Sequence, residues 1–119
     1  MNTDKEKITE VVQAYFLGTY HNNVEQLKQA FHEDAHITGI FKGNYVDWTR
    51  SEFIARMTGD ISSAEKNEPL DKVILSFDQA GDAAIVKARV VVGGNVFIDY
   101  ITLLKINGQW IIRNKSFVT

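Results

Sequence analysis

The chain has 119 residues, of which 45% are hydrophobic and 24% are charged, and its formal net charge at pH 7 is −2. This length and composition are typical of a single folded domain, here residues 1–119, with an apolar core of its own. The absence of cysteine excludes disulfides and thiol chemistry, and without a basic cluster or a long apolar run we expect neither a nucleic-acid nor a membrane partner.

The first third of the sequence predicts two helices and a strand. A capping box begins at Thr3, and apolar residues then recur every three or four positions, which predicts a long helix over residues 3–20. The polar residues 21–23 interrupt this pattern, and a shorter helix is expected over residues 24–31. In residues 35–41 the apolar side chains alternate with others, which predicts the first strand of the chain.

The middle of the chain predicts a third helix, over residues 50–59. A second capping box begins at Thr49, and Trp48 and Phe53 have the spacing of a hydrophobic staple across it. Residues 62–69 are polar and end in the only proline of the chain, so we interpret them as a surface loop.

The rest of the sequence has the period of two that strands show. The expected strands cover residues 71–78, 83–92, 96–106 and 109–118. Gly93-Gly94 and Asn107-Gly108 are suited to tight turns between them, because these residues tolerate positive φ. Helices followed by strands predict an α+β fold, in which a curved mixed sheet wraps around the long helix and leaves a hollow cone.

The hairpin at Asn107-Gly108 predicts which side chains share a face of the sheet. With a two-residue loop, Leu103 lies opposite Ile112, and Asp99 lies opposite Ser116. The face that results is largely apolar; it comprises Phe97, Asp99, Ile101, Leu103, Trp110, Ile112, Asn114 and Ser116. A carboxylate on such a face is costly unless it is paired or hydrogen-bonded.

Asp99 is therefore the residue of the sequence that most strongly indicates a function. It is either a structural acid, bonded to backbone groups or to Asn114 and Ser116, or a polar group that contacts the ligand in an otherwise apolar pocket. Desolvation would raise its pKa, and the neutral acid could then donate a hydrogen bond. A nearby lysine would reverse that shift, but Lys115 should face away in this register.

Other candidates for the pocket come from the helices. Tyr15 should face inward, either as a core aromatic or as a donor to a ligand oxygen. Trp48, Phe53 and Met57 either line the mouth of the cone or belong to the core, and Ile101 would lie beside Asp99. No two histidines and a carboxylate have metal-ligand spacing, so we expect no metal and no other cofactor.

The opposite face of the sheet is less polar than a solvent-exposed face should be. Its expected apolar residues are Ile85, Val91, Ile98, Tyr100, Thr102, Leu104 and Phe117, with Lys87, Arg89, Arg113 and Lys115 between them. This pattern favours a homodimer through the outer face, and the alternative is a monomer in which the cationic stems cover the apolar patch. The polar N-terminal segment is unlike a signal peptide, so we expect a cytoplasmic protein.

Order and spacing over nearly the whole chain resemble the nuclear transport factor 2-like (NTF2-like) superfamily of α+β cones. The segments that carry this resemblance are EVVQAYFLGTYHNNVEQLKQAFHEDAHITG, TRSEF and FIDYITLLKINGQWIIRNKSF. Within the superfamily, the chain is most similar to the small bacterial proteins called SnoaL-like or "Putative lumazine-binding". Such cones commonly pair through the outer face of the sheet.

The first segment also resembles the N-terminus of ketosteroid isomerase, a more distant cone of the same superfamily. The resemblance implies that Tyr15 and Asp99 would hold an enolate oxygen. The expected proton-transferring acid is replaced by Gly39, which cannot move a proton. His36 should face away from the hollow by alternation, but a bulge could turn it inward as a replacement base.

Three functional hypotheses follow from these residues. The first is a cone that binds a small apolar or aromatic molecule, with Tyr15 and Asp99 bound to an oxygen of that ligand. The second is an isomerase- or polyketide-cyclase-like enzyme that stabilises an enolate, with Tyr15, Asp99 and His36 as its catalytic candidates. The third is a dimerisation or interaction module without catalytic activity, since fold alone does not give function.

Overall fold

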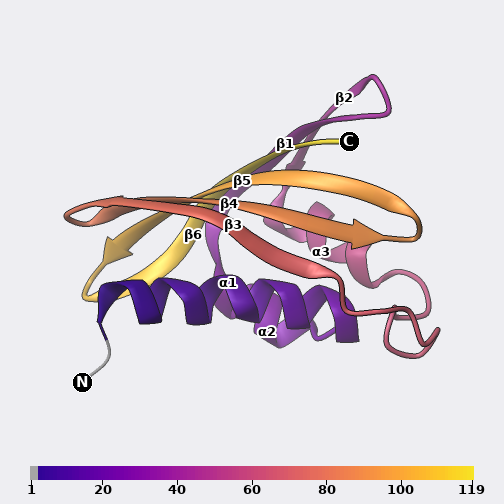
Figure 1. The fold of residues 1–119 in the computed structure, drawn as a ribbon, viewed down its shortest axis with the longest axis horizontal. Helices are drawn as coiled ribbons and strands as arrows, with labels where there is room; N and C mark the ends of the chain where they lie inside the picture. The colour runs from indigo at the N-terminus through magenta and orange to yellow at the C-terminus, as the bar shows by residue number, and fades with distance from the viewer. Residues whose placement is uncertain (1–2) are drawn as a thin grey trace.

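A long helix lies against a strongly curved sheet, and two shorter helices complete the fold (Figure 1). The computed structural model describes residues 3–119. In chain order the elements are α1 (Asp4–His21), α2 (Val24–Ala30), β1 (Phe31–Phe41), β2 (Asn44–Thr49), α3 (Arg50–Thr58), β3 (Lys72–Ala80), β4 (Ala83–Val92), β5 (Asn95–Ile106) and β6 (Gln109–Val118). The predicted α+β cone with a curved mixed sheet is confirmed.

The six strands form one sheet in the order β2-β1-β6-β5-β4-β3. The pair β1 and β6 is parallel, whereas the other neighbouring strands are antiparallel. The register shifts once in each of the β1–β6, β3–β4 and β5–β6 pairs. Such bulges bend and twist a sheet, and here the sheet arches across α1 (Figure 1).

The helices begin where the sequence predicts. The side chains of Thr3, Asn23 and Thr49 each accept a hydrogen bond from a backbone N–H of the following first turn. The backbone N–H of Thr49 also donates to the Glu52 side chain, which completes a capping box. The first helix ends at His21, and its C-cap residue Asn22 has a left-handed φ of 56°.

Strand β2 was not predicted from the sequence. It pairs with β1 through a tight turn at Lys42-Gly43, where φ is 48° and 85°. Lysine is an unusual residue for a left-handed position, so the turn lacks the sequence signal that marks the other hairpins. As an edge strand with an irregular polar pattern, β2 also lacks a clear period of two.

The two predicted hairpin loops are confirmed, because Val92 pairs with Asn95 and Ile106 pairs with Gln109. The predicted register holds as far as Leu103 and Ile112 and then slips by one residue. A bulge at Arg113 causes this slip.

Beyond the bulge, every side chain of β6 points to the face opposite the predicted one. Asp99 pairs with Phe117 rather than with Ser116, and Ile101 pairs with Lys115 rather than with Asn114. The prediction that Asn114 and Ser116 share the inner face was therefore wrong, since both are exposed. Lys115 and Phe117 were expected outside, but each is buried with 4% exposure. A one-residue insertion exchanges the two faces because side chains alternate along a strand.

Phe117 now occupies the space in front of Gly39. A Cβ atom added to Gly39 would lie 2.6 Å from three atoms of the Phe117 ring. No larger residue fits there without moving that ring, which explains why the chain has a glycine at this position of β1.

We predict that Gly39→Ala destabilises the chain by about 1–3 kcal/mol, because the added methyl group overpacks the core against Phe117. Urea unfolding of Gly39→Ala, Phe117→Leu and the double variant measures this coupling. The cost of Gly39→Ala should shrink when Phe117 is already leucine. Simple addition of the two costs would show that this contact is not the constraint.

Candidate functional site

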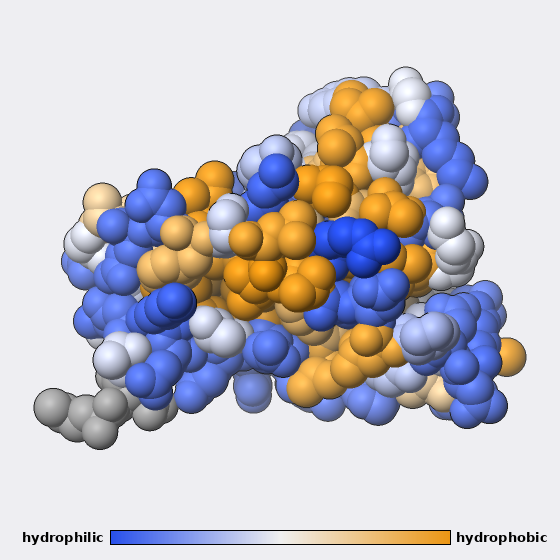
Figure 2. Space-filling model, in the orientation of Figure 1, coloured by the Kyte–Doolittle hydropathy of each residue, from blue (hydrophilic) through white to orange (hydrophobic). Residues whose placement is uncertain are grey.

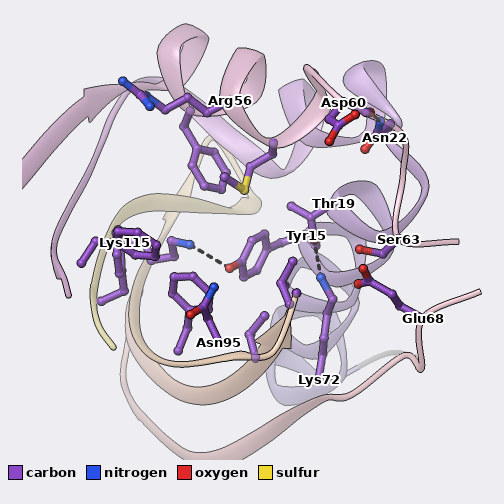
Figure 3. Close-up of a pocket in the computed structure, with 18 of the residues that line it drawn as sticks. Tyr15, Thr19, Asn22, Arg56, Asp60, Ser63, Glu68, Lys72, Asn95 and Lys115 are labelled. Atoms are coloured by element: carbon purple, nitrogen blue, oxygen red, sulfur yellow. Dashed lines mark hydrogen bonds between the residues drawn. The ribbon is translucent and has the colours of Figure 1, made fainter. Parts of the chain in front are cut away.

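A cavity of about 530 Å³ opens between α1, α3 and the inner face of the sheet (Figure 3). Its apolar walls include Trp48, Phe53, Met57, Val90, Phe97 and Phe117. The polar side chains that reach it include Tyr15, Thr19, Lys72 and Lys115. Asp99 lies behind this lining, fully buried.

Three side chains from three elements form a polar cluster at the wall of the cavity. The Tyr15 hydroxyl on α1 donates a hydrogen bond of 2.6 Å to Asp99 Oδ2 on β5. Lys115 Nζ on β6 donates a hydrogen bond of 2.7 Å to the Tyr15 hydroxyl. The same ammonium lies 3.5 Å from Asp99 Oδ2, which makes a buried ion pair. The cluster links the long helix to the two central strands of the sheet.

Aromatic rings surround the Lys115 ammonium. Nζ lies 4.5 Å from the ring centre of Tyr15, 4.6 Å from that of Phe53 and 5.4 Å from that of Phe117. Such contacts stabilise a desolvated cation through the negative faces of the rings. The ammonium thus lies among three aromatic rings and also lines the cavity.

The cluster has a charge arrangement that differs from the predicted one. Asp99 accepts from Tyr15 and faces the Lys115 ammonium, so it does not supply the donor to the cavity. Asp99 Oδ1 is buried and has no hydrogen-bond partner among residues 3–119. The charge of this carboxylate therefore depends on Lys115 for its compensation.

Burial sets the protonation of the groups around this cluster. It raises the pKa of the Tyr15 hydroxyl well above 10.0, and the neighbouring Asp99 charge adds to that increase. Burial also lowers the pKa of the Lys115 ammonium from 10.5, although the Asp99 charge opposes this shift. Tyr15 is consequently neutral at pH 7, and its hydroxyl bridges Lys115 and Asp99 through the two hydrogen bonds.

Lys72, the first residue of β3, is a second lysine of the cavity. Its Nζ donates a hydrogen bond of 2.8 Å to the Thr19 hydroxyl on α1. Burial, with a smaller contribution from the Lys115 charge, lowers the pKa of Lys72 from 10.5 to about 8, whereas Asp99 and Glu68 act in the opposite direction. Lys72 was not predicted as a site residue, because a lysine beside a polar loop has no pattern in the sequence that distinguishes it from a solvated one.

The structure brings together some of the predicted pocket residues and separates others. Tyr15, Trp48, Phe53 and Met57 line the cavity. Ile101 is fully buried, but it is not part of the lining.

The remaining predicted residues lie on the outer face. His36 is exposed, as alternation predicts, and its Nδ1 lies 2.8 Å from Asp47 Oδ1. Asn114 accepts from the His36 backbone N–H, and the Ser116 hydroxyl bonds to Thr38. The bulge thus removes Asn114 and Ser116 from the pocket. His36 lies on the outer face by the alternation of β1 and is not part of the cavity lining.

Metal-ligand clusters and membrane-spanning helices were both sought in the described part of the chain. Within residues 3–119, no three His, Cys, Asp or Glu side chains gather as metal ligands would. None of the helices described here is long and apolar enough to cross a membrane. The cytoplasmic location inferred from the polar N-terminal segment stays a prediction.

We predict that Asp99→Asn destabilises the chain by about 3–5 kcal/mol, because it leaves the buried Lys115 ammonium without a counter-ion. This cost is much larger than an exposed acid on the outer face would give. Adding Lys115→Met should restore much of the lost stability, since the double variant buries no charge. Chemical unfolding of the two single variants and the double variant measures the coupling. Equal stability of Asp99→Asn and the wild type would contradict the ion pair.

Comparisons with known proteins place the chain in a family. The "Putative lumazine-binding" family matches residues 3–118. The chain matches none of the curated proteins. The distant resemblance to ketosteroid isomerase is not confirmed by these comparisons.

Several solved structures share the fold over the whole chain. An NTF2-like protein of unknown function from Silicibacter pomeroyi DSS-3 is 24% identical, with a TM-score of 0.86, over 98% of both chains. One from Shewanella baltica OS155 is 22% identical, with a TM-score of 0.84, over 98% of this chain and 96% of that one. A third, from Methylobacillus flagellatus KT, is 24% identical, with a TM-score of 0.79, over 99% and 94%.

At these identities the solved structures show the fold alone. The family match covers almost all of the chain, and it agrees with the resemblance predicted from the sequence. The protein therefore belongs to the "Putative lumazine-binding" family and has the NTF2-like fold.

Proposed function

We propose that the chain binds a small apolar or aromatic molecule through an oxygen atom that accepts a hydrogen bond from Lys115. The observation that carries this proposal is the Lys115 ammonium, buried in the wall of an apolar cavity. A lysine has three N–H donors. One is bound to Tyr15, and Asp99 lies close enough to take a second, which leaves a donor for a ligand.

The size and walls of the cavity support binding over a role in interaction alone. Ligand pockets generally measure about 300–1,000 Å³ and have mostly apolar walls with a few placed polar groups. The cavity of about 530 Å³ fits this description. An interaction module without a ligand would favour a filled interior.

We propose binding and not catalysis, because neither position at which a base was expected places one near the ligand. An enolate-stabilising enzyme needs a group that moves a proton within reach of the ligand. The Phe117 ring fills the space in front of Gly39, and His36 is bound to Asp47 on the outer face. Tyr15 and Lys115 could hold an oxygen, but the cluster alone supplies no proton-transfer partner of the predicted kind.

The choice of test compounds follows from the cavity and from the family. Aromatic rings on the walls favour flat molecules, such as phenols, steroids and aromatic polyketides. The name of the family adds pteridines, with lumazine itself as the simplest case. Each of these classes carries an oxygen acceptor.

We predict that at least one of these compounds raises the melting temperature of the wild-type chain by several degrees. Binding at a hundredfold excess over Kd contributes about 2.7 kcal/mol, enough for such a shift. The shift should fall sharply in the double variant Asp99→Asn/Lys115→Met, which keeps the cavity but removes the ammonium of Lys115. Lys105→Met, whose lysine pairs with Asp4 outside the cavity, is the control. Equal shifts in the double variant and the wild type would remove Lys115 from the binding site.

We also propose that two copies of the chain pair through the outer face of the sheet. Ile85, Tyr100 and Leu104 lie on that face and are 40%, 41% and 37% exposed. Figure 2 shows apolar side chains gathered over the strands, between hydrophilic regions. Phe117 and Lys115, expected on this face from the sequence, lie inside instead, so the apolar patch is smaller than predicted.

Light scattering coupled to size exclusion should give twice the 13.5 kDa of one chain. Tyr100→Glu places a charge in the centre of the proposed interface and should yield the monomer. Val24→Glu changes an exposed apolar residue on α2 and should leave the dimer intact. A monomeric wild-type protein at micromolar concentration would contradict the dimer.

A further inference from the structure

We propose that Lys72 selects ligands that carry an anionic group, such as a carboxylate or a sulfonate, attached to the apolar part that fills the cavity. This inference rests on the proposed function, because it requires the cavity to admit a ligand. It adds a second anchor to the oxygen contact at Lys115 and narrows the ligand class from oxygen-bearing to anionic molecules.

The contacts of Lys72 leave its ammonium available to the cavity. The Thr19 hydroxyl lies 3.0 Å from the carbonyl oxygens of Tyr15 and Phe16, to which it donates. Its oxygen can therefore only accept from Lys72, as it does at 2.8 Å. Two N–H donors of the Lys72 ammonium remain. Figure 3 shows Lys72 and Lys115 on either side of Tyr15.

The charges around the cavity do not neutralise Lys72 at close range. The charged side chains of the lining are Arg56, Asp60, Lys66, Glu68, Lys72 and Lys115. Asp60 pairs with Lys66 at 3.6 Å, and Lys115 pairs with Asp99 behind the wall. Among residues 3–119, no carboxylate lies within ion-pair distance of Lys72. A partly buried cation without a close counter-ion favours an anionic ligand.

The electrostatics of Lys72 couple this binding to pH. The charged and titratable groups that face it are Tyr15 from α1, Asp99 from β5, Lys115 from β6 and Glu68 from the preceding loop. Burial and the Lys115 charge together lower the pKa of Lys72 to about 8, so the ammonium is mostly protonated at pH 7 and mostly neutral at pH 9. An anion prefers the protonated form. Its affinity should therefore be full below pH 8 and fall as the pH rises through that value.

Two fluorescent probes differ by the charge that matters here. 8-Anilino-1-naphthalenesulfonate carries a sulfonate, whereas N-phenyl-1-naphthylamine has the same ring system without it, and both brighten in apolar sites. Titrations of both probes are compared for the wild type, Lys72→Met and Lys105→Met. Lys105 is also a partly exposed strand lysine, but it lies outside the cavity.

Lys72→Met should weaken the sulfonate probe about tenfold or more, the value expected for a lost charge-assisted hydrogen bond. It should leave the neutral probe within about twofold, because methionine preserves the apolar stem of the lysine. Lys105→Met should change neither affinity. In the wild type, the sulfonate affinity relative to the neutral probe should fall about tenfold between pH 7 and pH 9, and Lys72→Met should abolish this dependence.

The outcomes separate this inference from the proposed function. If Lys72→Met weakens both probes equally, or if the sulfonate binds Lys72→Met as tightly as the wild type, Lys72 is not an anion contact. If the neutral probe binds the wild type and the sulfonate does not, the anionic ligand class is wrong and the proposed cavity binding stands. If neither probe binds the wild type, the inference about Lys72 is overturned, whereas the proposed function is decided by the melting temperatures measured with the oxygen-bearing compounds.

Discussion

The structure depends on a buried ammonium that must be neutralised from within the fold. Because a bulge at Arg113 turns Lys115 inward, a cation enters an apolar interior where desolvation is costly. Asp99 supplies the counter-charge from the neighbouring strand, and Tyr15 bridges the two groups from the helix. A single polar cluster thus links the inner face of the sheet to α1.

Stability alone does not account for such a cluster. Well-packed apolar residues of similar volume are often as stable as a buried ion pair, or more so. A cluster that borders a cavity can instead present a fixed polar group to a ligand without the cost of reorganising it. The aromatic rings around Lys115 contribute to this, because their negative faces stabilise the ammonium at its place in the wall of the cavity.

Much of the fold follows from the sequence because its signals are local. Capping residues fix the starts of the helices, and the Asn107-Gly108 and Gly93-Gly94 pairs fix two hairpins. Strand β2 was missed because its turn contains a lysine at positive φ, which no turn preference indicates. The family resemblance was also predictable, since it rests on the order of elements over the whole chain.

The candidate site was less predictable because it depends on long-range geometry. Tyr15 and Asp99 could be identified as inward-facing polar residues, but their partner could not. Asn114, Lys115 and Ser116 point to alternate faces of the sheet with or without a bulge. The bulge alone determines which of them faces the core. Lys72 acquires its unusual environment from α1 and β6, neither of which adjoins it in the sequence.

The most direct test of this account is an NMR titration of the lysine side chains, labelled with carbon-13 at Cε and assigned by single Lys-to-Met variants. The account predicts that Lys72 titrates near pH 8 and that the pKa of Lys115 also lies below the ordinary value of 10.5. If Lys72 and Lys115 titrated like a solvent-exposed lysine, the two ammonium groups would not lie in a buried cavity, and the proposed site would be wrong.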